Sequence, residues 1–191
     1  MRCMKETLRH ELLKKRQRIP IEEVHAKSKR IQKRLFAMPA FQKAHTVLFY
    51  VSYEKEVDTH AMIKESLALG KQVVVPCTDK KTKTLSLSVL RCWDDLCHGA
   101  YNILEPKKEC RTNVSFESID LVIVPGVAFD PHGNRLGHGM GYYDSLLRQF
   151  KDKPKIGLAF ELQLLDHIPA EQHDIQVDTI VSEERVIVCN S

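Results

Sequence analysis

The sequence predicts an α/β fold: a layered, mostly parallel sheet flanked by helices, with a pair of helices at its N-terminus. Two segments near the N-terminus carry apolar residues at helical spacing. Short apolar runs of strand length then alternate with further helical segments, a pattern typical of parallel strands joined by helices. The chain has 191 residues, of which 43% are hydrophobic and 28% charged. Because a chain of this size can bury a full core, we expect one domain over residues 1–191.

The N-terminal helices are predicted from two apolar stripes. The first helix is expected over residues 4–18 and ends before Pro20, and the second runs from Glu22 to about Met38 and ends at Pro39. Proline ends a helix because it lacks a backbone donor and clashes with the preceding turn. The stripes consist of Met4, Leu8, Leu12 and Leu13 in the first helix and Val24, Ile31, Leu35 and Met38 in the second.

The strands are predicted from apolar runs. Residues 46–52 are apolar on both faces, which indicates a buried parallel strand. A helix is expected over residues 59–69, with Gly70 as its C-cap. Residues 85–90 alternate with serine and indicate a more exposed strand. These elements predict an open, Rossmann-like sheet. Its other strands are expected at 73–77, 120–124, 156–160, 179–181 and 185–188, and one more helix at about 142–150.

The charge is unevenly distributed. Lys and Arg number 29 and Asp and Glu 25, but residues 1–36 hold 12 basic and 4 acidic side chains. A basic front end favours an anionic partner, either nucleic acid or the phosphates of a small ligand, while a solvated helix face is the alternative. Single-strand binding uses aromatic side chains between basic ones, and residues 5–34 contain none. We therefore expect no nucleic-acid partner.

Two other classes of protein are disfavoured. No apolar run approaches the roughly 20 residues of a membrane helix, and the first residues lack the apolar stretch of a secretory signal. We therefore expect a cytoplasmic protein without a membrane partner. The cysteines form no C-x-x-C pair, so we expect reduced thiols and no zinc site. They are Cys3, Cys77, Cys92, Cys97, Cys110 and Cys189.

The segment from Val124 to Asp144 carries the chemistry. It leaves the end of a predicted strand, where open α/β sheets bind ligands, and passes through a predicted type I turn at residues 130–133. Gly137, Gly139 and Gly141 then alternate, so backbone N–H groups can converge on a phosphate before the next helix begins. Neither a Walker A sequence nor the dinucleotide fingerprint is present. A flexible turn is the alternative.

Two charged residues frame these glycines. Arg135 precedes them and can bind phosphate oxygens with two parallel hydrogen bonds. Asp144 follows them, and a carboxylate beside a phosphate commonly holds Mg²⁺, although an acidic residue in a first helical turn also simply stabilises the helix.

The whole string, Pro-Gly-Val-Ala-Phe-Asp-x-x-Gly-x-Arg-Leu-Gly-x-Gly-x-Gly-Tyr-Tyr-Asp over residues 125–144, closely resembles the signature of the 5-formyltetrahydrofolate cyclo-ligase family. Shorter matches agree in order, so the resemblance covers nearly the whole chain. They are Lys5-x-x-Leu-Arg9, Glu56-Val-Asp-Thr59 and His173-Asp174-x-x-x-Asp178.

The resemblance implies an ATP- and Mg²⁺-dependent enzyme that cyclises 5-formyltetrahydrofolate to 5,10-methenyltetrahydrofolate and releases ADP and phosphate. A formamide oxygen is a poor leaving group, so ATP phosphorylates it before N10 attacks. Phosphoryl transfer needs positioning and charge neutralisation more than a protein nucleophile. The implied partners are the two small-molecule substrates, in a monomer or weak homo-oligomer. A related nucleotide or sugar-phosphate enzyme on the same scaffold is the competing hypothesis.

The resemblance also implies roles for individual residues. Tyr142 and Arg135 would be catalytic, with Tyr142 beside the formyl group, and Asp144 and Asp174 would hold Mg²⁺. The ATP-binding residues would be Lys5, Arg9, Arg135, Leu136, Gly137, His138, Gly139, Met140, Gly141, Tyr142 and Tyr143. The folate-binding residues would be Val51, Glu56, His138, Gly139, Met140, Gly141 and Tyr142. We expect Arg9, Arg135 and Asp144 to converge on one cleft.

Each role has a plainer alternative. Glu56 taken alone is a solvated loop carboxylate, Tyr142 and Tyr143 are the exposed and packed faces of a helix start, and Asp174 and Asp178 belong to a polar loop. Three positions depart from the family pattern and put affinity and pH profile in doubt. His138 stands where some members have arginine, Met140 stands at a variable position that is sometimes basic, and Ser145 stands where arginine is frequent. The nearby histidines do not have the spacing of a metal site. They are His132, His138 and His173.

Overall fold

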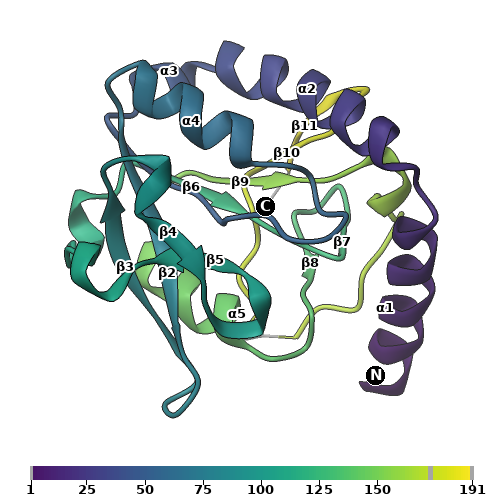
Figure 1. Ribbon diagram of the computed structural model, residues 1–191. Helices are drawn as coiled ribbons and strands as arrows, with labels where there is room; N and C mark the ends of the chain where they lie inside the picture. Colours follow the sequence, from purple (N-terminus) through teal and green to yellow (C-terminus); the bar gives the residue numbers. More distant parts are fainter. Residues whose placement is uncertain (1, 172–173, 190–191) are drawn as a thin grey trace.

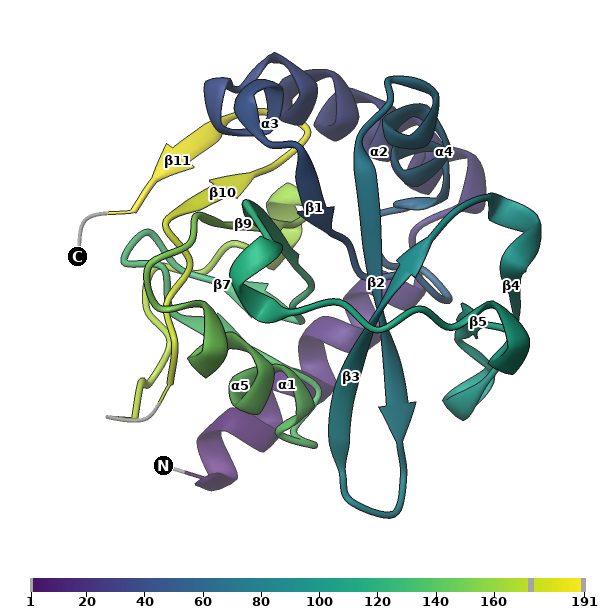
Figure 2. The ribbon, with the colours of Figure 1, turned by 90° about the vertical axis from the view of Figure 1, so that its left-hand side faces the viewer.

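The computed structural model describes residues 2–171 and 174–189, and its centre is a seven-stranded sheet of order β11-β10-β9-β6-β1-β2-β3 (Figures 1 and 2). The inner strands are parallel, as predicted, while β3 and β11 run antiparallel at the two edges. The strands are β1 (Thr46–Leu48), β2 (Gln72–Asp79), β3 (Thr84–Leu90), β6 (Leu121–Val124), β9 (Lys155–Leu158), β10 (Thr179–Val181) and β11 (Val186–Val188).

Helices cover both faces of this sheet. Figures 1 and 2 show α2, α3 and α4 together on one side and α5 on the other. The side chains of the central strands alternate accordingly: Val47 packs with the first group of helices, and Leu48 packs with α5. The central strands β1, β6 and β9 therefore bury both of their faces, which explains their largely apolar sequences. The helices are α1 (Arg2–Gln17), α2 (Ile21–Ala37), α3 (Pro39–Lys43), α4 (His60–Ala68) and α5 (Tyr142–Leu147).

The first helix lies apart from the second. In Figure 1, α1 runs beside the hairpin of β7 (Ala128–Phe129) and β8 (Arg135–Leu136). Leu12 of α1 packs with Val127, Ala128 and Leu136 in an apolar cluster of its own. The expected N-terminal pair of helices is present, and this packing holds α1 against the β7–β8 hairpin that follows β6.

The structure differs from the sequence-based predictions in three places. The predicted strand over residues 46–52 ends at Leu48, because the chain leaves the sheet to form hydrogen bonds of another kind. Pro39 begins a short helix as well as ending α2, since proline fits the first helical turn. Residues 91–119, for which no element was predicted, form short 3₁₀ turns and a small sheet of β4 (Leu96–His98) and β5 (Leu104–Pro106).

Cys77, Cys92, Cys97, Cys110 and Cys189 are free thiols, and the side chain of Cys3 lies outside the described part of the chain. No helix in residues 2–171 and 174–189 is both long and apolar enough to cross a membrane.

Candidate active site

A pocket of about 350 Å³ opens beyond the C-terminal ends of β1 and β6, the edge at which open α/β sheets bind ligands. Two segments form opposite walls: the β1–α4 segment (residues 50–59) and the glycine loop (residues 137–141). A third side comes from β2, β3 and the small β4–β5 sheet. Its lining residues are Pro76, Thr78, Leu85, Tyr101, Ile103, Leu104 and Glu105.

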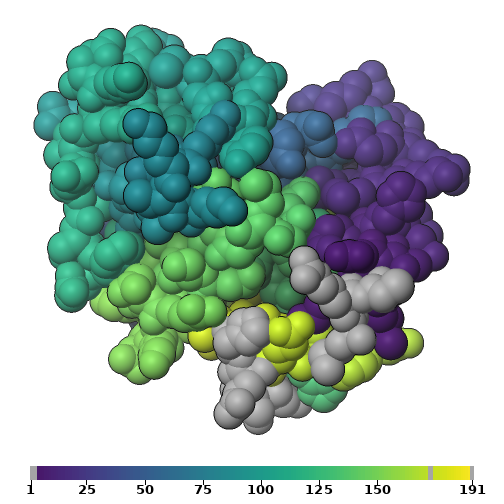
Figure 3. Space-filling model, turned by 90° about the horizontal axis from the view of Figure 1, so that it is seen from below, coloured from purple at the N-terminus to yellow at the C-terminus, as the bar shows by residue number. Residues whose placement is uncertain are grey.

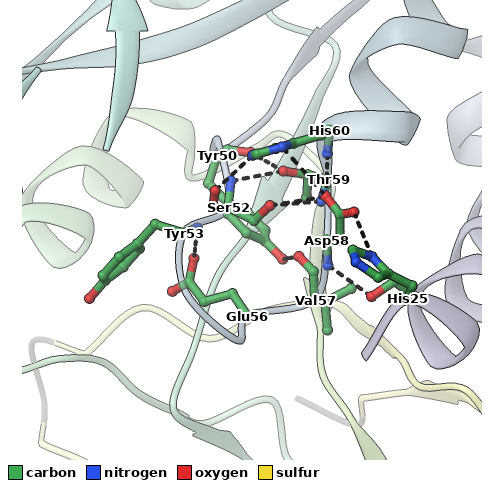
Figure 4. Close-up of polar contacts among 10 residues, drawn as sticks. His25, Tyr50, Ser52, Tyr53, Glu56, Val57, Asp58, Thr59 and His60 are labelled. Carbon is green, nitrogen blue, oxygen red and sulfur yellow. Dashed lines mark hydrogen bonds and ion pairs between the residues drawn. The ribbon is translucent and has the colours of Figure 1, made fainter. Parts of the chain in front are cut away.

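The β1–α4 segment is held by reciprocal hydrogen bonds (Figure 4). The backbone N–H of Ser52 donates to Thr59 Oγ1, and the N–H of Thr59 donates to Ser52 Oγ, each at 3.0 Å. Thr59 Oγ1 also donates to the Tyr50 carbonyl at 2.7 Å, and Tyr50 Oη donates to the Val57 carbonyl at 2.9 Å. These bonds replace the sheet ladder that ends at Leu48 and close the segment into a fixed loop.

Asp58 connects the same segment to two helices. Its Oδ1 accepts the N–H of His60 at 2.8 Å at the start of α4, and its Oδ2 lies 3.4 Å from His25 Nδ1 on α2. Its own N–H donates to Ser28 Oγ at 2.9 Å. The wall is therefore fixed at both ends (Figure 4).

Glu56 lies inside the pocket wall with only 6% of its surface exposed. Its Oε2 accepts the N–H of Tyr53 at 3.3 Å, and its Oε1 lies 3.3 Å from His138 Nε2. The alternative of a solvated loop carboxylate is therefore wrong. A buried carboxylate facing a cavity is available to bind hydrogen-bond donors of a ligand.

The opposite wall begins with the β7–β8 hairpin, which places Arg135. The predicted turn at residues 130–133 is present: the Gly133 N–H donates to the Asp130 carbonyl at 2.9 Å. Asp130 Oδ1 also accepts the N–H groups of His132 and Asn134, both at 3.0 Å. Because this turn sets the hairpin register, Arg135 enters β8 with its side chain directed into the pocket lining.

Arg135 is buried and is surrounded by polar and aromatic partners. Its Nη1 donates to the Pro125 carbonyl at 3.3 Å, its Nη2 pairs with Asp144 Oδ1, and its guanidinium lies 5.8 Å from the centre of the Tyr143 ring. Its Nε atom is buried without a partner among the described residues. Burial raises the pKa of Tyr143, the Glu56 charge raises it further, and Arg135 opposes them, so the Tyr143 hydroxyl stays protonated.

The glycine loop presents free backbone donors to the pocket. In the described part of the chain, no hydrogen bond engages the N–H groups of residues 137–141, all of which line the pocket. Gly139 and Gly141 adopt positive φ angles of 91° and 76°, which residues with a Cβ rarely adopt. Successive N–H groups turned by such angles form a concave anion-binding surface.

Arg9 reaches this loop from α1. Its Nε donates to the Gly137 carbonyl at 2.8 Å, and Figure 3 shows α1 and the segment around residue 140 side by side on one surface. A Cβ on Gly137 would lie 2.8 Å from Arg135 Nη1, so this glycine fits between the two arginines. Of the three residues expected to converge on one cleft, Arg135 and Asp144 line the pocket, whereas Arg9 contacts the glycine loop without lining the pocket itself.

Lys5 and Asp174 lie together but outside the residues that line the pocket. Lys5 Nζ is 2.9 Å from Asp174 Oδ2 and 3.4 Å from Glu171 Oε1. The pKa of Lys5 is raised: burial lowers it, but the bonds to the two carboxylates outweigh burial. His173 lies outside the described residues. Asp178 pairs with Lys155 at 3.2 Å and stabilises the sheet.

Tyr142 and Tyr143 face different surroundings, as the alternative reading of a helix start proposed. Tyr143 packs in the core, while Tyr142 opens to the pocket with its hydroxyl 3.3 Å from that of Tyr101. This bond raises the pKa of Tyr142, so its hydroxyl is a hydrogen-bond donor at neutral pH.

The other predicted site residues divide between the pocket and the core. Val51, His138 and Met140 line the pocket, whereas Leu136 is buried in the apolar cluster with Leu12. Sequence reasoning missed the whole third side. Residues 91–119 show no periodicity that would place Tyr101 near Tyr142, and nothing in the sequence marks the residues of β2 and β3 as pocket lining.

The oxygen donors for a cation are limited. The described residues contain no group of three or more His, Cys, Asp and Glu side chains that could hold a metal ion. Asp144 does lie at the pocket wall, and Asp174 lies near the N-terminal end of α1. One or two carboxylates suffice for Mg²⁺ only where phosphate oxygens and water supply the further ligands, which is the usual arrangement for this ion.

Known proteins provide an independent comparison. Residues 2–183 match the model of the 5-formyltetrahydrofolate cyclo-ligase family. The 5-formyltetrahydrofolate cyclo-ligase of Escherichia coli K12 is 32% identical over 157 residues, which cover 80% of this chain and 86% of that protein. The mouse enzyme of the same name is 28% identical over 190 residues, covering 94% of each chain.

Solved structures agree in fold. The 5,10-methenyltetrahydrofolate synthetase of Aquifex aeolicus superimposes with a TM-score of 0.87 at 34% identity, covering 98% of this chain and 94% of that one. The synthetase of Mycoplasma pneumoniae gives a TM-score of 0.75 at 24% identity, covering 94% of this chain and 98% of that one, and supports the fold alone.

Proposed function

The chain belongs to the 5-formyltetrahydrofolate cyclo-ligase family and converts 5-formyltetrahydrofolate into 5,10-methenyltetrahydrofolate, and we propose that it does so by ATP-dependent phosphorylation of the formyl oxygen within the pocket. The family uses ATP. The proposal assigns ATP phosphates to the glycine loop and the folate to the wall that carries Glu56, in one domain over residues 1–191.

The reaction requires an activated oxygen. The γ-phosphoryl group moves from ATP to the formyl oxygen, which gives an iminium phosphate and leaves ADP. N10 attacks the formyl carbon and loses its proton, and the carbon–oxygen bond breaks as phosphate leaves. The products are ADP, phosphate and the methenyl bridge. Because charge develops on phosphoryl oxygens, the protein contributes mainly donors and positive charge in fixed positions.

The observation that carries the proposal is a set of N–H groups at residues 137–141 that have no hydrogen-bond partner in residues 2–171 and 174–189 and are framed by Arg9 and Arg135. Backbone donors at positive-φ glycines bind phosphate oxygens without a side chain. Arg135 is paired with Asp144 here and has one buried nitrogen without a partner, so a phosphate oxygen can complete its hydrogen bonds. Lys5, one turn before Arg9 on α1, adds positive charge at the same end of the helix.

The folate side of the pocket supports the second half of the assignment. The pterin ring carries N–H donors, and the buried Glu56 carboxylate is an acceptor for them. Val51 supplies an apolar surface beside it, and His138 reaches Glu56 from the glycine loop. Tyr142, whose hydroxyl is protonated, is placed to donate to the formyl or phosphoryl oxygen. The loop therefore contributes to both substrate sites.

We assign Mg²⁺ to Asp144 and Asp174 together with ATP phosphates. The fit rests on oxygen chemistry, since each carboxylate is already held by a cation, Arg135 or Lys5, and can exchange that partner. When bound, Mg²⁺ would neutralise charge on the phosphates. Until then, Arg135 and Lys5 hold the two carboxylates in place.

The test follows methenyltetrahydrofolate absorbance with purified protein, 5-formyltetrahydrofolate, Mg²⁺ and ATP. We expect product formation that depends on ATP and falls at least about 100-fold in Arg135→Ala and in Asp144→Ala. Arg148→Ala, an exposed arginine at the other end of α5, is the matched control and should keep full activity.

Two results would contradict the proposal in different ways. A folded protein that binds ATP but forms no product would indicate another acceptor on this scaffold. Failure to bind ATP would mean that the glycine loop is only a turn. Asp174→Ala tests whether Asp174 holds Mg²⁺ together with Asp144. A higher Mg²⁺ concentration for half-maximal activity would support the assignment, and wild-type kinetics would restrict the cation to Asp144.

Location and assembly complete the proposal. We assign the chain to the cytoplasm, to be tested by cell fractionation, and one relative in Arabidopsis thaliana is described as mitochondrial. We also infer a monomer or weak homo-oligomer that binds its two small-molecule substrates without nucleic acid, to be tested by sedimentation and by salt titration against DNA.

A further inference from the structure

A buried arginine beneath the β1–α4 segment has no part in the mechanism so far. Arg16 lies in the last turn of α1 with 1% of its surface exposed. Its Nε and Nη2 atoms are buried, and neither has a hydrogen-bond partner among the described residues. Guanidinium groups remain charged in proteins, and burying such a charge without a partner destabilises the fold.

The polar neighbours of Arg16 are already engaged. Arg16, Tyr50, Glu56 and Gln163 all line one narrow void behind the pocket wall. Gln163 Nε2 donates to the carbonyls of Gly126 and Val127 at 2.9 and 3.0 Å, and Tyr50 Oη donates to a carbonyl of its own segment. Glu56 is the one acidic residue among those that line the void.

The two charges act on the same tyrosines. Burial raises the pKa of Tyr50, the Glu56 charge raises it further, and the Arg16 charge lowers it. The pKa of Tyr53 is likewise raised by burial and then by the Glu56 charge, and is lowered by the Arg16 charge. Arg16 and Glu56 therefore lie close enough to influence common neighbours, with Arg16 opposing the field of the carboxylate.

The end of α1 is also fastened to the segment that carries Glu56. Gln17 Nε2 donates to Glu54 Oε2 at 3.0 Å, and Lys55 Nζ donates to the Gln17 carbonyl at 2.7 Å. Arg9, two helical turns before Arg16, contacts the glycine loop. Because residues seven apart lie on one helix face, a single face of α1 serves both walls of the pocket.

We propose that Arg16 is a positioning residue for the folate: from α1 it supplies the positive charge that holds the buried Glu56 carboxylate in place for the substrate. This inference rests on the proposed function, in which Glu56 contacts the folate. It requires no movement of Arg16 into the pocket, because the charge acts across the void through a medium that screens it weakly.

The experiment is a double-mutant cycle of Arg16→Met and Glu56→Gln, with steady-state kinetics for both substrates. We expect Arg16→Met to raise KM for 5-formyltetrahydrofolate about tenfold and to change kcat and KM for ATP less than about twofold. Arg16→Lys, which restores the charge, should recover most of the loss. In the Glu56→Gln background, Arg16→Met should change the folate KM less than about twofold. Arg18→Met is the control, since Arg18 is exposed two residues further on.

Melting temperatures of the wild type, the two single variants and the double variant measure the coupling between Arg16 and Glu56 without an activity assay. The shift caused by Arg16→Met should differ between the two backgrounds by about 4 °C, with the larger destabilisation where Glu56 is present. Equal shifts in both backgrounds, or an equal rise of KM for folate and ATP, would overturn the proposal and leave Arg16 as packing. A wild-type protein without product formation would refute the proposed function instead, while the thermal cycle would still test the pair.

Discussion

The two walls of the pocket differ in how their backbones are held. In the β1–α4 segment, the N–H groups of Ser52, Asp58 and Thr59 all donate to side chains of fixed neighbours (Figure 4). In the glycine loop, the N–H groups of residues 137–141 have no partner in the described part of the chain, and Met140 is 53% exposed. One wall is preorganised, and the other keeps its donors free for a ligand.

This difference explains why the two substrates suit different walls. A pterin ring is rigid and is recognised by a carboxylate in a fixed place, which a preorganised segment provides at little entropic cost. A triphosphate offers many acceptor oxygens, and unpaired N–H groups can satisfy them as the loop orders around it. Four experiments test whether the two walls differ in this way.

The first prediction concerns the contact that holds the glycine loop to α1. Arg9→Met removes the bond to the Gly137 carbonyl and a positive charge. We expect kcat/KM for ATP to fall about 100-fold, because a phosphate-binding group is lost, with little change in stability. Lys14→Met, exposed on the same helix, is the control. An unchanged KM for ATP would show that Arg9 only packs against the loop.

The second prediction concerns the preorganised wall. Thr59 is fully buried and its hydroxyl bridges Tyr50 and Ser52. Thr59→Val leaves a carbonyl and an N–H unpaired, so we expect a loss of about 1–3 kcal/mol in unfolding free energy. Thr82→Val, which breaks an exposed hydroxyl pair with Thr84, should change stability by less than about 0.5 kcal/mol. Urea unfolding measures both, and equal losses would argue against a specially held segment.

The third prediction compares the walls by amide hydrogen exchange. We expect ATP with Mg²⁺ to slow exchange at residues 137–141 about tenfold, because free N–H groups gain phosphate partners. Amides at Ser52 and Thr59 should already exchange slowly in the free protein and should change little. If both segments gained protection equally, closure of the whole pocket would explain the result better than ordering of one wall.

The smallest effect is expected far from both walls. Asp120 lies at the opposite end of the sheet, and its Oδ2 accepts the N–H groups of Thr46 and His45, both at 2.9 Å. These bonds, that from Thr46 first, hold the pKa of Asp120 below its ordinary value. Its stabilisation is therefore present above the unfolded pKa near 3.9 and is lost as pH falls through the lower folded pKa.

Asp120→Asn tests whether this stabilisation depends on pH in that direction. At pH 7 the variant should be less stable by about 0.5–1 kcal/mol, and the difference should shrink as the pH is lowered below about 4. Denaturant unfolding at several pH values measures it, and enzyme activity at pH 7 should match the wild type. A stability difference independent of pH would show that the carboxylate charge is not responsible.

Some features could be predicted from residue order alone. Runs such as Leu121–Val124 are apolar at every position, and only a strand buried on both faces has that requirement. The string from Arg135 to Asp144 indicated a phosphate-binding turn because glycine spacing is a local backbone property. Within the basic front end, Arg9 contacts the glycine loop, while Lys14 and Lys15 are exposed; phosphate binding by Arg9 stays a prediction.

The tertiary structure decided what no local pattern encodes. Whether Glu56 is solvated or buried depends on α1 and the glycine loop covering it, since His138 comes from 82 residues away. The burial of Arg16 and the contact of Tyr101 with Tyr142 likewise depend on packing between distant segments. The sequence by itself determined the periodic elements and the glycine loop, because both follow from the steric properties of neighbouring residues. Burial and charge pairing required the fold, because they are set by contacts between segments that only folding brings together.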